Sequence, residues 1–321
     1  MNFFDLPADE LRTYAPAVEE PIDFDGFWRE TLASSPPAAP ELRRVPTHFP
    51  DIDVFDVTFA GYGGDPISGW LLVPTRRDSP LTAIVEFKGY GEGRGLPHER
   101  LHWVAAGYAH FIMDSRGQGS MWGSGGATAD PHGSGPASSG MLTRGIESPQ
   151  GYYYRRLITD AANAVGSVAL IDGVDADRIV TAGSSQGGAL AIAAAALAPR
   201  VTAVLADVPF LAHPARAVGL ATAGPYLELG RYLAVHRDSA ASVFSTLSYV
   251  DIANFAPRVQ APGIYSVALQ DHTCPPSTVY AALNRVTSPK EIVEYAYNDH
   301  EGGGTAHWLK QIDWLSRRTR D

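Results

Sequence analysis

The pentapeptide Gly183-Ser184-Ser185-Gln186-Gly187 decides the fold of this chain. It has the form G-x-S-x-G, it follows the apolar β-like run 178–182, and it precedes an alanine-rich helical run over 188–198. A strand, a sharp turn and a helix in this order are what the nucleophile elbow of an α/β-hydrolase requires. Glycine two positions on either side of the serine leaves room for the turn. The context predicts that Ser185 is a nucleophile; the alternative interpretation is an ordinary glycine-rich turn between a strand and a helix.

The segments around the elbow predict an α/β fold. From residue 82 onward, short apolar runs alternate with helical patterns, which is typical of a mostly parallel sheet with helices on both faces. The predicted strands span 83–87, 109–113, 179–182, 201–206, 264–269 and 292–295. The predicted helices span 97–106, 152–169, 186–198, 276–285 and 305–317. Upstream of them, residues 51–74 predict two or three antiparallel strands, including 54–59 and 67–73.

The 321 residues are interpreted as one α/β-hydrolase domain. Residues 1–45, with a short amphipathic helix near 24–32, are expected to form an N-terminal arm on the main body. Two insertions interrupt the alternation. The segment 117–150 is rich in Gly, Ser and Pro and predicts a long loop, whereas 209–256 predicts a helical excursion where hydrolases often carry a cap.

Composition excludes several classes of function. The net charge is −10 and no basic run exists, so nucleic acid and anionic membranes are not expected partners. Cys274 is the only cysteine, which rules out an intrachain disulfide. The N-terminus lacks the features of a signal peptide, and no stretch of about 20 apolar residues could span a membrane. A cytoplasmic location is therefore the expectation.

A serine hydroxyl needs a base, and the base needs a carboxylate that fixes its tautomer. In α/β-hydrolases the chain order is Ser, then Asp or Glu, then His. Asp271 follows the predicted strand 264–269, and His300 follows the predicted strand 292–295. The carboxyl ends of parallel strands share one edge of a sheet, the edge at which Ser185 emerges. We predict Ser185, Asp271 and His300 as the catalytic triad.

Four neighbouring residues are rivals for these roles. Asp207 ends a predicted strand but is interpreted as structure beneath the pocket. His272 adjoins Asp271 and is expected to point away from the serine, and Asp299 is expected to shape the loop before His300. His307 lies inside the last predicted helix, where packing or capping is the favoured role.

The tetrahedral intermediate needs two preorganised N–H donors. The backbone N–H of Gln186, directly after the nucleophile, is the first candidate. The second is the N–H of Tyr90 in the glycine-rich loop 88–93 after the strand 83–87, unless that loop is a plain turn. The loop 88–93 is called the oxyanion loop after this expected role.

Further residues are expected to support the site or to line its pocket. Arg116, in Arg116-Gly117-Gln118-Gly119 at another strand end, is predicted to brace the elbow or the histidine loop through bidentate hydrogen bonds rather than to take part in the chemistry. A small apolar acyl pocket would favour acetyl groups. The expected support residues are Arg116, Gln118, Gly183, Gly187 and Glu301, and the expected pocket walls are Tyr90, Pro209 and Phe210.

Metal and nucleotide readings have less support. The segment His98-Glu99-Arg100-Leu101-His102 matches the zinc-protease motif H-E-x-x-H, but it is short, follows a proline and lacks a third ligand nearby. Two partly exposed helix histidines are the favoured interpretation. No dinucleotide or P-loop motif is present, and Cys274 is expected to be a small buried packing residue.

Three motifs together resemble the signature of carbohydrate esterase family 7, the group of acetyl xylan esterases and cephalosporin-C deacetylases. They are Arg116-Gly117-Gln118-Gly119, Gly183-Ser184-Ser185-Gln186-Gly187 and His300-Glu301, in the family's order. Further matches, at 3–7, 24–28, 143–146, 152–156, 207–211 and 274–278, extend the resemblance over nearly the whole chain.

This resemblance implies a serine esterase that removes acetyl groups from xylo-oligosaccharides and from the 3′ position of cephalosporin C. It implies Ser185, Asp271 and His300 as the triad, and the main-chain N–H groups of Tyr90 and Gln186 as the oxyanion hole. It further implies a homohexamer whose active sites face an internal chamber, an intracellular location, and no metal or cofactor.

The chain also departs from the family. Lys88 stands where the family usually has histidine, so a cation that influences leaving-group preference is expected beside the oxyanion loop. The segment 120–139 is unusually rich in Gly, Ser and Ala, which puts the acyl range and the chamber entrance in doubt. Two alternatives stay open: a carboxylesterase or peptidase of another α/β-hydrolase group, and a non-enzymatic binding module.

Overall fold

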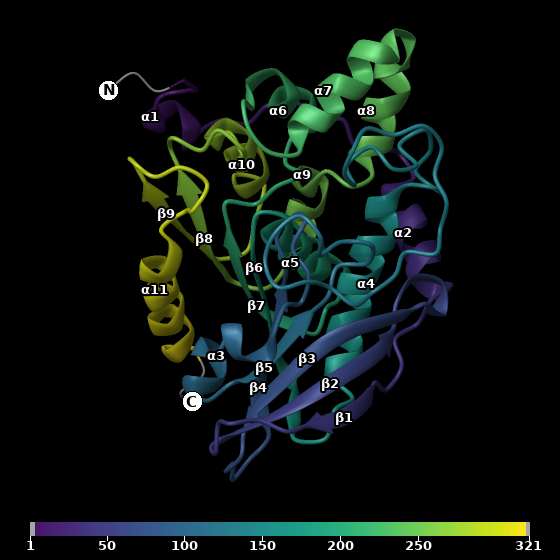
Figure 1. The fold of residues 1–321 in the computed structure, drawn as a ribbon. Coiled ribbons are helices and arrows are strands. Elements are labelled where there is room, and N and C mark those ends of the chain that lie inside the picture. The colour runs from purple at the N-terminus through teal and green to yellow at the C-terminus, as the bar shows by residue number, and fades with distance from the viewer. Residues whose placement is uncertain (1–3, 319–321) are drawn as a thin grey trace.

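Nine strands form one sheet in the computed structural model, which describes residues 4–318 (Figure 1). The strands, in chain order, are β1 Glu41–Val45, β2 Ile52–Ala60, β3 Pro66–Pro74, β4 Leu81–Phe87, β5 Ala109–Met113, β6 Val174–Ser184, β7 Val201–Asp207, β8 Gly263–Ala268 and β9 Lys290–Tyr295. They lie in the order β1-β2-β3-β5-β4-β6-β7-β8-β9. All pairings from β5 to β9 in this order are parallel, and β1, β2 and β3 add on by antiparallel pairings. The sheet is thus mostly parallel with antiparallel N-terminal strands, as predicted.

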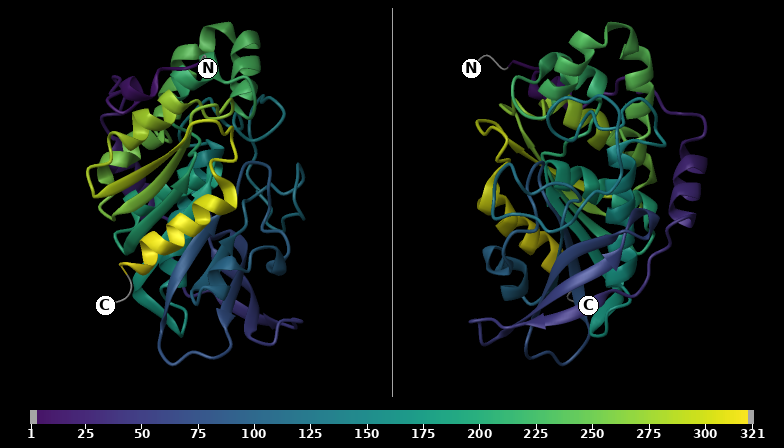
Figure 2. Two further views of the ribbon diagram at one scale, coloured as in Figure 1. Left: turned by 90° about the vertical axis from the view of Figure 1, so that its left-hand side faces the viewer. Right: turned by 45° about the vertical axis from the view of Figure 1, so that its right-hand side comes forward.

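Helices cover both faces of this sheet, as the alternation of patterns predicted (Figure 2). One face carries α4 (Tyr153–Val168), α5 (Gln186–Leu197) and α10 (Pro276–Leu283), whose apolar side chains share one core with the strands. The other face carries α3 (His102–Ala105) and α11 (Gly304–Ser316), which contribute Trp103 and Trp314 to a second core.

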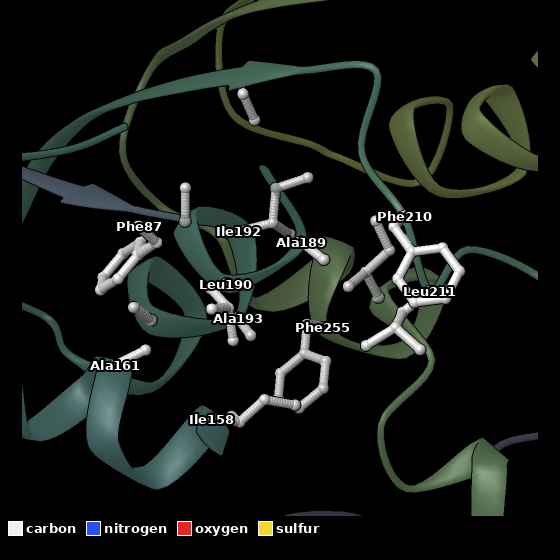
Figure 3. Packing of buried hydrophobic residues seen from close by; sticks show 14 of the residues in the cluster. Phe87, Ile158, Ala161, Ala189, Leu190, Ile192, Ala193, Phe210, Leu211 and Phe255 are labelled. Atoms are coloured by element: carbon white, nitrogen blue, oxygen red, sulfur yellow. The ribbon is translucent and has the colours of Figure 1, made fainter. Parts of the chain in front are cut away.

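Helix α5 is apolar on every side and lies inside the larger core (Figure 3). Its residues Ala189, Leu190 and Ala193 are fully buried, and they pack near Ile158 of α4 and Phe255. Small side chains let the helix lie close to the strands, since alanine adds little thickness. The N-terminus of α5, where the elbow sits, is therefore held by a rigid core.

Two segments rise above the carboxyl ends of the strands. The segment 117–150 contains no helix or strand as the structure describes it. The Ser68 N–H of β3 donates to Thr128 Oγ1 at 3.0 Å, and an isolated bridge between Glu92 and Trp122 joins the segment to the loop after β4. The segment 209–256 forms the upper layer in Figure 1. It contains α6 (Pro214–Leu220), α7 (Tyr226–Val235), the 3₁₀ turn η3 (Arg237–Ser239), α8 (Ala240–Ser248) and α9 (Ile252–Phe255), and the 3₁₀ turn η4 (Ala256–Arg258) begins at its end.

The N-terminal region differs from the prediction at one end. It contains α1 (Ala8–Leu11) and the expected amphipathic helix α2 (Phe24–Ala33), but residues 41–45 form the edge strand β1 rather than part of an arm. Cross-strand ion pairs hold this strand: Arg43 to Asp56 and Arg44 to Asp53, both at 2.5 Å. Paired charges on an edge strand give little hydrophobic signal, so the strand was not predicted.

The helix predicted over 97–106 is wrong in form. A 3₁₀ turn, η2 (Pro97–Glu99), and the single turn of α3 replace it, because Arg100 between them has the non-helical angles φ −135° and ψ 70°. A further 3₁₀ turn, η1 (Tyr62–Gly64), joins β2 to β3. Within residues 4–318, no helix combines the length and the apolar character needed to cross a bilayer.

Candidate active site

Ser185 lies in a sharp turn between β6 and α5, where its φ is 56° and its ψ is −119°. Left-handed φ is uncommon for a residue with a side chain and marks a constrained position. The two flanking glycines permit this turn. A Cβ on Gly183 would lie 2.4 Å from the carbonyl carbon of Gly187, and one on Gly187 would lie 2.2 Å from the carbonyl oxygen of Phe87. The end of β7 completes the support, because the Ser185 N–H donates to the Asp207 carbonyl at 2.9 Å.

The structure brings together Ser185, His300 and Asp271 from three different loops. His300 Nε2 lies 2.9 Å from Ser185 Oγ, and His300 Nδ1 lies 2.8 Å from Asp271 Oδ2. Because a carboxylate only accepts hydrogen bonds, this pairing assigns the proton to Nδ1 and leaves Nε2 free to accept from the serine. The arrangement can therefore remove the hydroxyl proton from Ser185.

Asp271 is fully buried and firmly oriented. Its Oδ1 accepts hydrogen bonds from the backbone N–H groups of Thr273 and Cys274, both at 2.8 Å, while Oδ2 faces His300. Both oxygens are thus occupied, so the imidazole that Asp271 holds has little freedom to turn away from Ser185.

The rival residues lie in other arrangements. Asp207 accepts a hydrogen bond from Gln311 at 2.8 Å and lies 3.0 Å from His307, so it faces α11 rather than His300. His272 Nδ1 hydrogen-bonds with Thr222 Oγ1 at 3.1 Å, and Asp299 accepts from the His272 backbone N–H at 2.9 Å. These positions agree with the structural roles expected of them.

Two backbone N–H groups close to Ser185 in the fold are without a protein acceptor among the described residues. Within residues 4–318, no protein acceptor takes a hydrogen bond from the N–H of Tyr90 or of Gln186. Gln186 begins α5, so its N–H is one of the donors that a helix N-terminus leaves unsatisfied. Tyr90 lies in the loop after β4, and β4 pairs with β6, the strand that leads to Ser185. Gln186 directly follows Ser185, and Tyr90 lines the same cavity as Ser185.

Two buried glutamines link these loops. Gln118 Oε1 accepts from the Gly91 N–H at 2.6 Å, and Gln118 Nε2 donates to Gln186 Oε1 at 2.9 Å. Gln186 Nε2 in turn donates to the carbonyl of Lys88 at 3.2 Å. The side chains of Gln118 and Gln186 therefore hold the oxyanion loop against the elbow, a support that the Arg116–Gly119 motif predicted only in outline.

Arg116 braces a different part of the molecule from the one predicted. It is fully buried and makes bidentate hydrogen bonds to Asp160 of α4, at 2.6 and 2.8 Å, and a further one to Asp65 at 2.8 Å. It contacts neither the elbow nor the histidine loop through these bonds. Arg116 instead fixes the start of the 117–150 loop on α4, because its carbonyl also accepts from Tyr153 at 2.6 Å.

Glu301, another expected support residue, makes a local contact: it accepts a hydrogen bond from the Asn298 side chain at 2.6 Å.

Ser185 and His300 open into a cavity of about 1040 Å³. The cavity lies between the strand ends, the 117–150 loop and α7, and Tyr90, Trp122 and Leu227 are among its walls. Pro209 and Phe210, which were predicted as walls, do not line it. Phe210 is fully buried and packs on Tyr226 with ring centres 4.6 Å apart. Apolar residues suit both a cavity wall and the core beneath it, so their character alone did not separate the two positions.

Lys88 also differs from its expected position. It is buried and forms an ion pair with Glu92 at 2.5 Å, and it does not line the cavity. Arg100 joins the cluster through Glu92 at 3.0 Å and Glu86 at 2.6 Å. Burial lowers the pKa of Lys88. The Lys88 cation is therefore paired within its own loop and does not line the cavity in which a leaving group would lie.

One set of side chains has metal-ligand spacing within the described residues: Asp271, Cys274 and His300, whose ligand atoms lie within 4.8 Å of one another. Asp271 and His300 are hydrogen-bonded to each other, and burial raises the pKa of the Cys274 thiol. A thiol, unlike a thiolate, is a poor metal ligand, so this set suits proton transfer better than metal binding. His98 and His102 of the H-E-x-x-H segment form no such set and do not share a helix.

Sequence reasoning missed Glu228 and Trp122. Both line the cavity, and both hydrogen-bond to Tyr90. Glu228 lies on α7 in a helical pattern, and Trp122 lies in a glycine-rich loop, so neither residue had a local signal that separates it from ordinary surface or core residues.

Comparisons with known proteins agree with this geometry. The family model described as acetyl xylan esterase (AXE1) matches residues 1–318. A solved acetyl xylan esterase from Paenibacillus sp. R4 is 35% identical, covers 96% of this chain and 99% of that chain, and superposes with a TM-score of 0.90. Acetyl xylan esterase 1 from Thermoanaerobacterium sp. JW/SL YS485 is 32% identical with a TM-score of 0.87, covering 96% and 98%. The acetyl esterase Axe7A of Xylanibacter ruminicola is 25% identical over 95% of this chain and 69% of its own length. These likenesses and the sheet confirm the predicted α/β-hydrolase fold.

Proposed function

Since this chain belongs to the acetyl xylan esterase family, and is a carboxylic ester hydrolase, we propose that it removes acetyl groups from acetylated xylo-oligosaccharides by a Ser-His-Asp acyl-enzyme mechanism. The observation that carries the proposal is the continuous hydrogen-bonded line from Asp271 through His300 to Ser185, which ends in an open cavity. By the family resemblance, the 3′-acetyl group of cephalosporin C is a second proposed substrate.

The first half of the proposed reaction acylates the enzyme. Ser185 Oγ adds to the acetyl carbonyl carbon while its proton moves to His300 Nε2, and the carbonyl oxygen becomes an oxyanion. The N–H groups of Tyr90 and Gln186 are the proposed donors to that oxyanion. The intermediate then collapses, the bond from carbon to the sugar oxygen breaks, and His300 gives its proton to the departing alcohol.

The second half releases acetate. Water enters the cavity and gives a proton to His300 Nε2 as its oxygen adds to the acyl carbon. A second oxyanion forms in the same place and collapses as the bond from the acyl carbon to Ser185 Oγ breaks, which releases acetic acid, while Ser185 Oγ takes back the proton from His300. Asp271 keeps its charge throughout and stabilises the imidazolium in both halves.

The testing experiment measures hydrolysis of p-nitrophenyl acetate, butyrate and octanoate by the wild type and by Ser185→Ala. We expect fast acetate turnover that falls with acyl length, and a loss of about 10⁴–10⁶-fold in kcat for the variant. Acetylated xylo-oligosaccharides and cephalosporin C then test the two proposed substrates. Near-normal activity of Ser185→Ala would overturn the mechanism, and a preference for octanoate or for amides would move the chain to a carboxylesterase or peptidase activity.

The resemblance also supports a proposed quaternary structure, a homohexamer. Sedimentation velocity of the purified protein would give a single species six times the chain mass if this proposal is correct, whereas a monomer would contradict it.

A further inference from the structure

Tyr90 is hydrogen-bonded at every polar group except its N–H. The hydroxyl lies 2.8 and 2.7 Å from the two carboxylate oxygens of Glu228 and donates to that carboxylate. It accepts from the backbone N–H groups of Met141 and Leu142, the latter at 3.1 Å. The Tyr90 carbonyl accepts from Trp122 Nε1 at 2.7 Å. Hydrogen bonds to the 117–150 loop and to α7 therefore hold Tyr90 in place, and only its N–H is left to donate to another group.

The backbone around Glu228 leaves room for its carboxylate and donates a hydrogen bond to it. The residue is buried, and Leu142 N–H donates to its Oε2 at 3.2 Å. A Cβ on Gly140 would lie 2.1 Å from Glu228 Oε1, so the absence of a side chain there makes room for the carboxylate. Gly140 also has a φ of 110°, which favours glycine at this position.

This buried acid makes no ion pair among the described residues. Arg144 and Arg231 are near enough to lower its pKa, but burial outweighs them and the pKa of Glu228 is raised. A buried acid without a paired cation costs free energy of folding. Such a cost is common where a group fixes the geometry of a functional site.

The geometry points to Glu228 as a positioning residue of the oxyanion hole, which acts by holding the phenol of Tyr90 so that the backbone N–H of Tyr90 stays aimed at the oxyanion. This inference rests on the proposed function of Ser185. Oxyanion donors act on a charge that develops only in the transition state. A misplaced donor therefore lowers the kcat of each folded molecule and leaves KM nearly unchanged. A general loss of folded protein instead lowers the number of active molecules.

The experiment compares Glu228→Leu, Glu228→Gln, Tyr90→Phe and the double variant Tyr90→Phe/Glu228→Leu with p-nitrophenyl acetate. Tyr249→Phe is the matched control: it removes a hydroxyl–carboxylate bond of the same kind, to Asp23 at 2.6 Å, in the same insertion but away from the cavity. We expect Glu228→Leu and Tyr90→Phe each to lower kcat by at least about tenfold, a fraction of the 10²–10³ that a whole oxyanion donor contributes. KM should change by less than about twofold, and Tyr249→Phe should keep the wild-type kcat.

The double variant and the glutamine variant isolate the route through Tyr90. If Glu228 acts through the phenol, the double variant loses no more than either single variant. Glu228→Gln keeps an oxygen that accepts from the Tyr90 hydroxyl and should retain most of the activity. Independent losses that multiply in the double variant, or a glutamine variant as impaired as the leucine variant, would overturn the inference.

A trifluoromethyl ketone gives a readout without turnover. Ser185 Oγ adds to the ketone carbon, its proton moves to His300, and the ketone oxygen becomes an oxyanion in the proposed hole. The inhibition constant should rise in Tyr90→Phe by the same factor as kcat/KM falls. Tyr90→Phe keeps the ring and is informative even if Glu228→Leu fails to fold. An unchanged kcat in Tyr90→Phe, beside an inactive Ser185→Ala, would overturn the inference alone, whereas an active Ser185→Ala would overturn the proposed function.

Discussion

Ser185 shows at the scale of one residue how backbone strain serves the site. Its left-handed φ of 56° turns the chain between β6 and α5 and points the hydroxyl toward His300. This conformation costs about 1–3 kcal/mol, and it persists because β6, β7 and α5 hold the residues on either side. The strain therefore cannot be relieved without moving one of these elements.

We predict that Gly187→Ala will lower both activity and stability. The added Cβ would meet the Phe87 carbonyl oxygen at 2.2 Å, and that backbone leads directly into the oxyanion loop. Overpacking of this kind costs about 1–3 kcal/mol and should shift the loop, so kcat should fall as well. Urea unfolding and p-nitrophenyl acetate turnover measure the two effects. Gly219→Ala is the control, because nothing lies within 4 Å of its Cβ; equal losses in the two variants would contradict the prediction.

At the scale of elements, the short helix α9 is joined to the loop after β7 by one buried carboxylate. Asp251 accepts from the Ala253 N–H at 2.9 Å, as an N-cap, and from the His213 N–H at 3.0 Å. Burial raises the pKa of Asp251 to about 7, although Arg285 nearby acts in the opposite direction. The two N–H donors also favour the charged form, but burial outweighs them, so the folded state holds a proton on this carboxyl more tightly than the unfolded chain does.

We predict that this carboxyl makes stability depend on pH. In the unfolded chain an aspartate has a pKa of about 3.9, so between about pH 4 and pH 7 the folded state binds a proton that the unfolded state has lost. The stabilisation is present below pH 4 and disappears as pH rises through 7, with a slope of at most about 1.4 kcal/mol per pH unit. Asp251→Asn should remove this slope in urea unfolding at pH 5 and pH 8. An identical pH difference in the wild type and the variant would count against the assignment.

At the scale of the whole molecule, the N-terminal segment is tied to the strand ends that hold the site. Asp5 pairs with Arg216 of α6 at 2.9 Å and accepts from the Ser277 N–H of α10 at 2.8 Å. Phe4 stacks on His272, next to Asp271, with ring centres 4.3 Å apart. Phe4 and Asp5 therefore brace the loop that carries Asp271, the residue that orients His300.

We predict that Asp5→Ala lowers the free energy of unfolding by about 1.5–3 kcal/mol, the usual contribution of hydrogen bonds to a charged group. Asp9→Ala, at an exposed position of α1, should change it by less than about 0.5 kcal/mol. Thermal and urea unfolding of both variants provide the measurement. If Asp5→Ala is as stable as Asp9→Ala, the N-terminal segment does not contribute to the fold in this way.

The sequence by itself determined the features that depend on local pattern. The period of apolar residues predicted β4 to β9 and the long helices, because each element must bury one face or all of itself in a core. The elbow was predictable because few residues fit a turn at φ 56° flanked by close backbone contacts. Asp271 and His300 could be proposed because parallel strands deliver their carboxyl ends to one edge.

Only the tertiary structure decided which side chains far apart in sequence share a contact. Glu228 reaches Tyr90 across 138 residues, and Lys88 is buried in an ion pair with Glu92. Phe210 enters the core instead of the cavity wall. Lys88 and Phe210 lie in loops, where no periodicity reports the direction of a side chain, and the helical pattern of α7 does not say which partner Glu228 meets. A buried ion pair or hydrogen bond forms only after the layers have packed. These contacts therefore follow from the closed molecule, whereas the elbow and the sheet follow from the local chain.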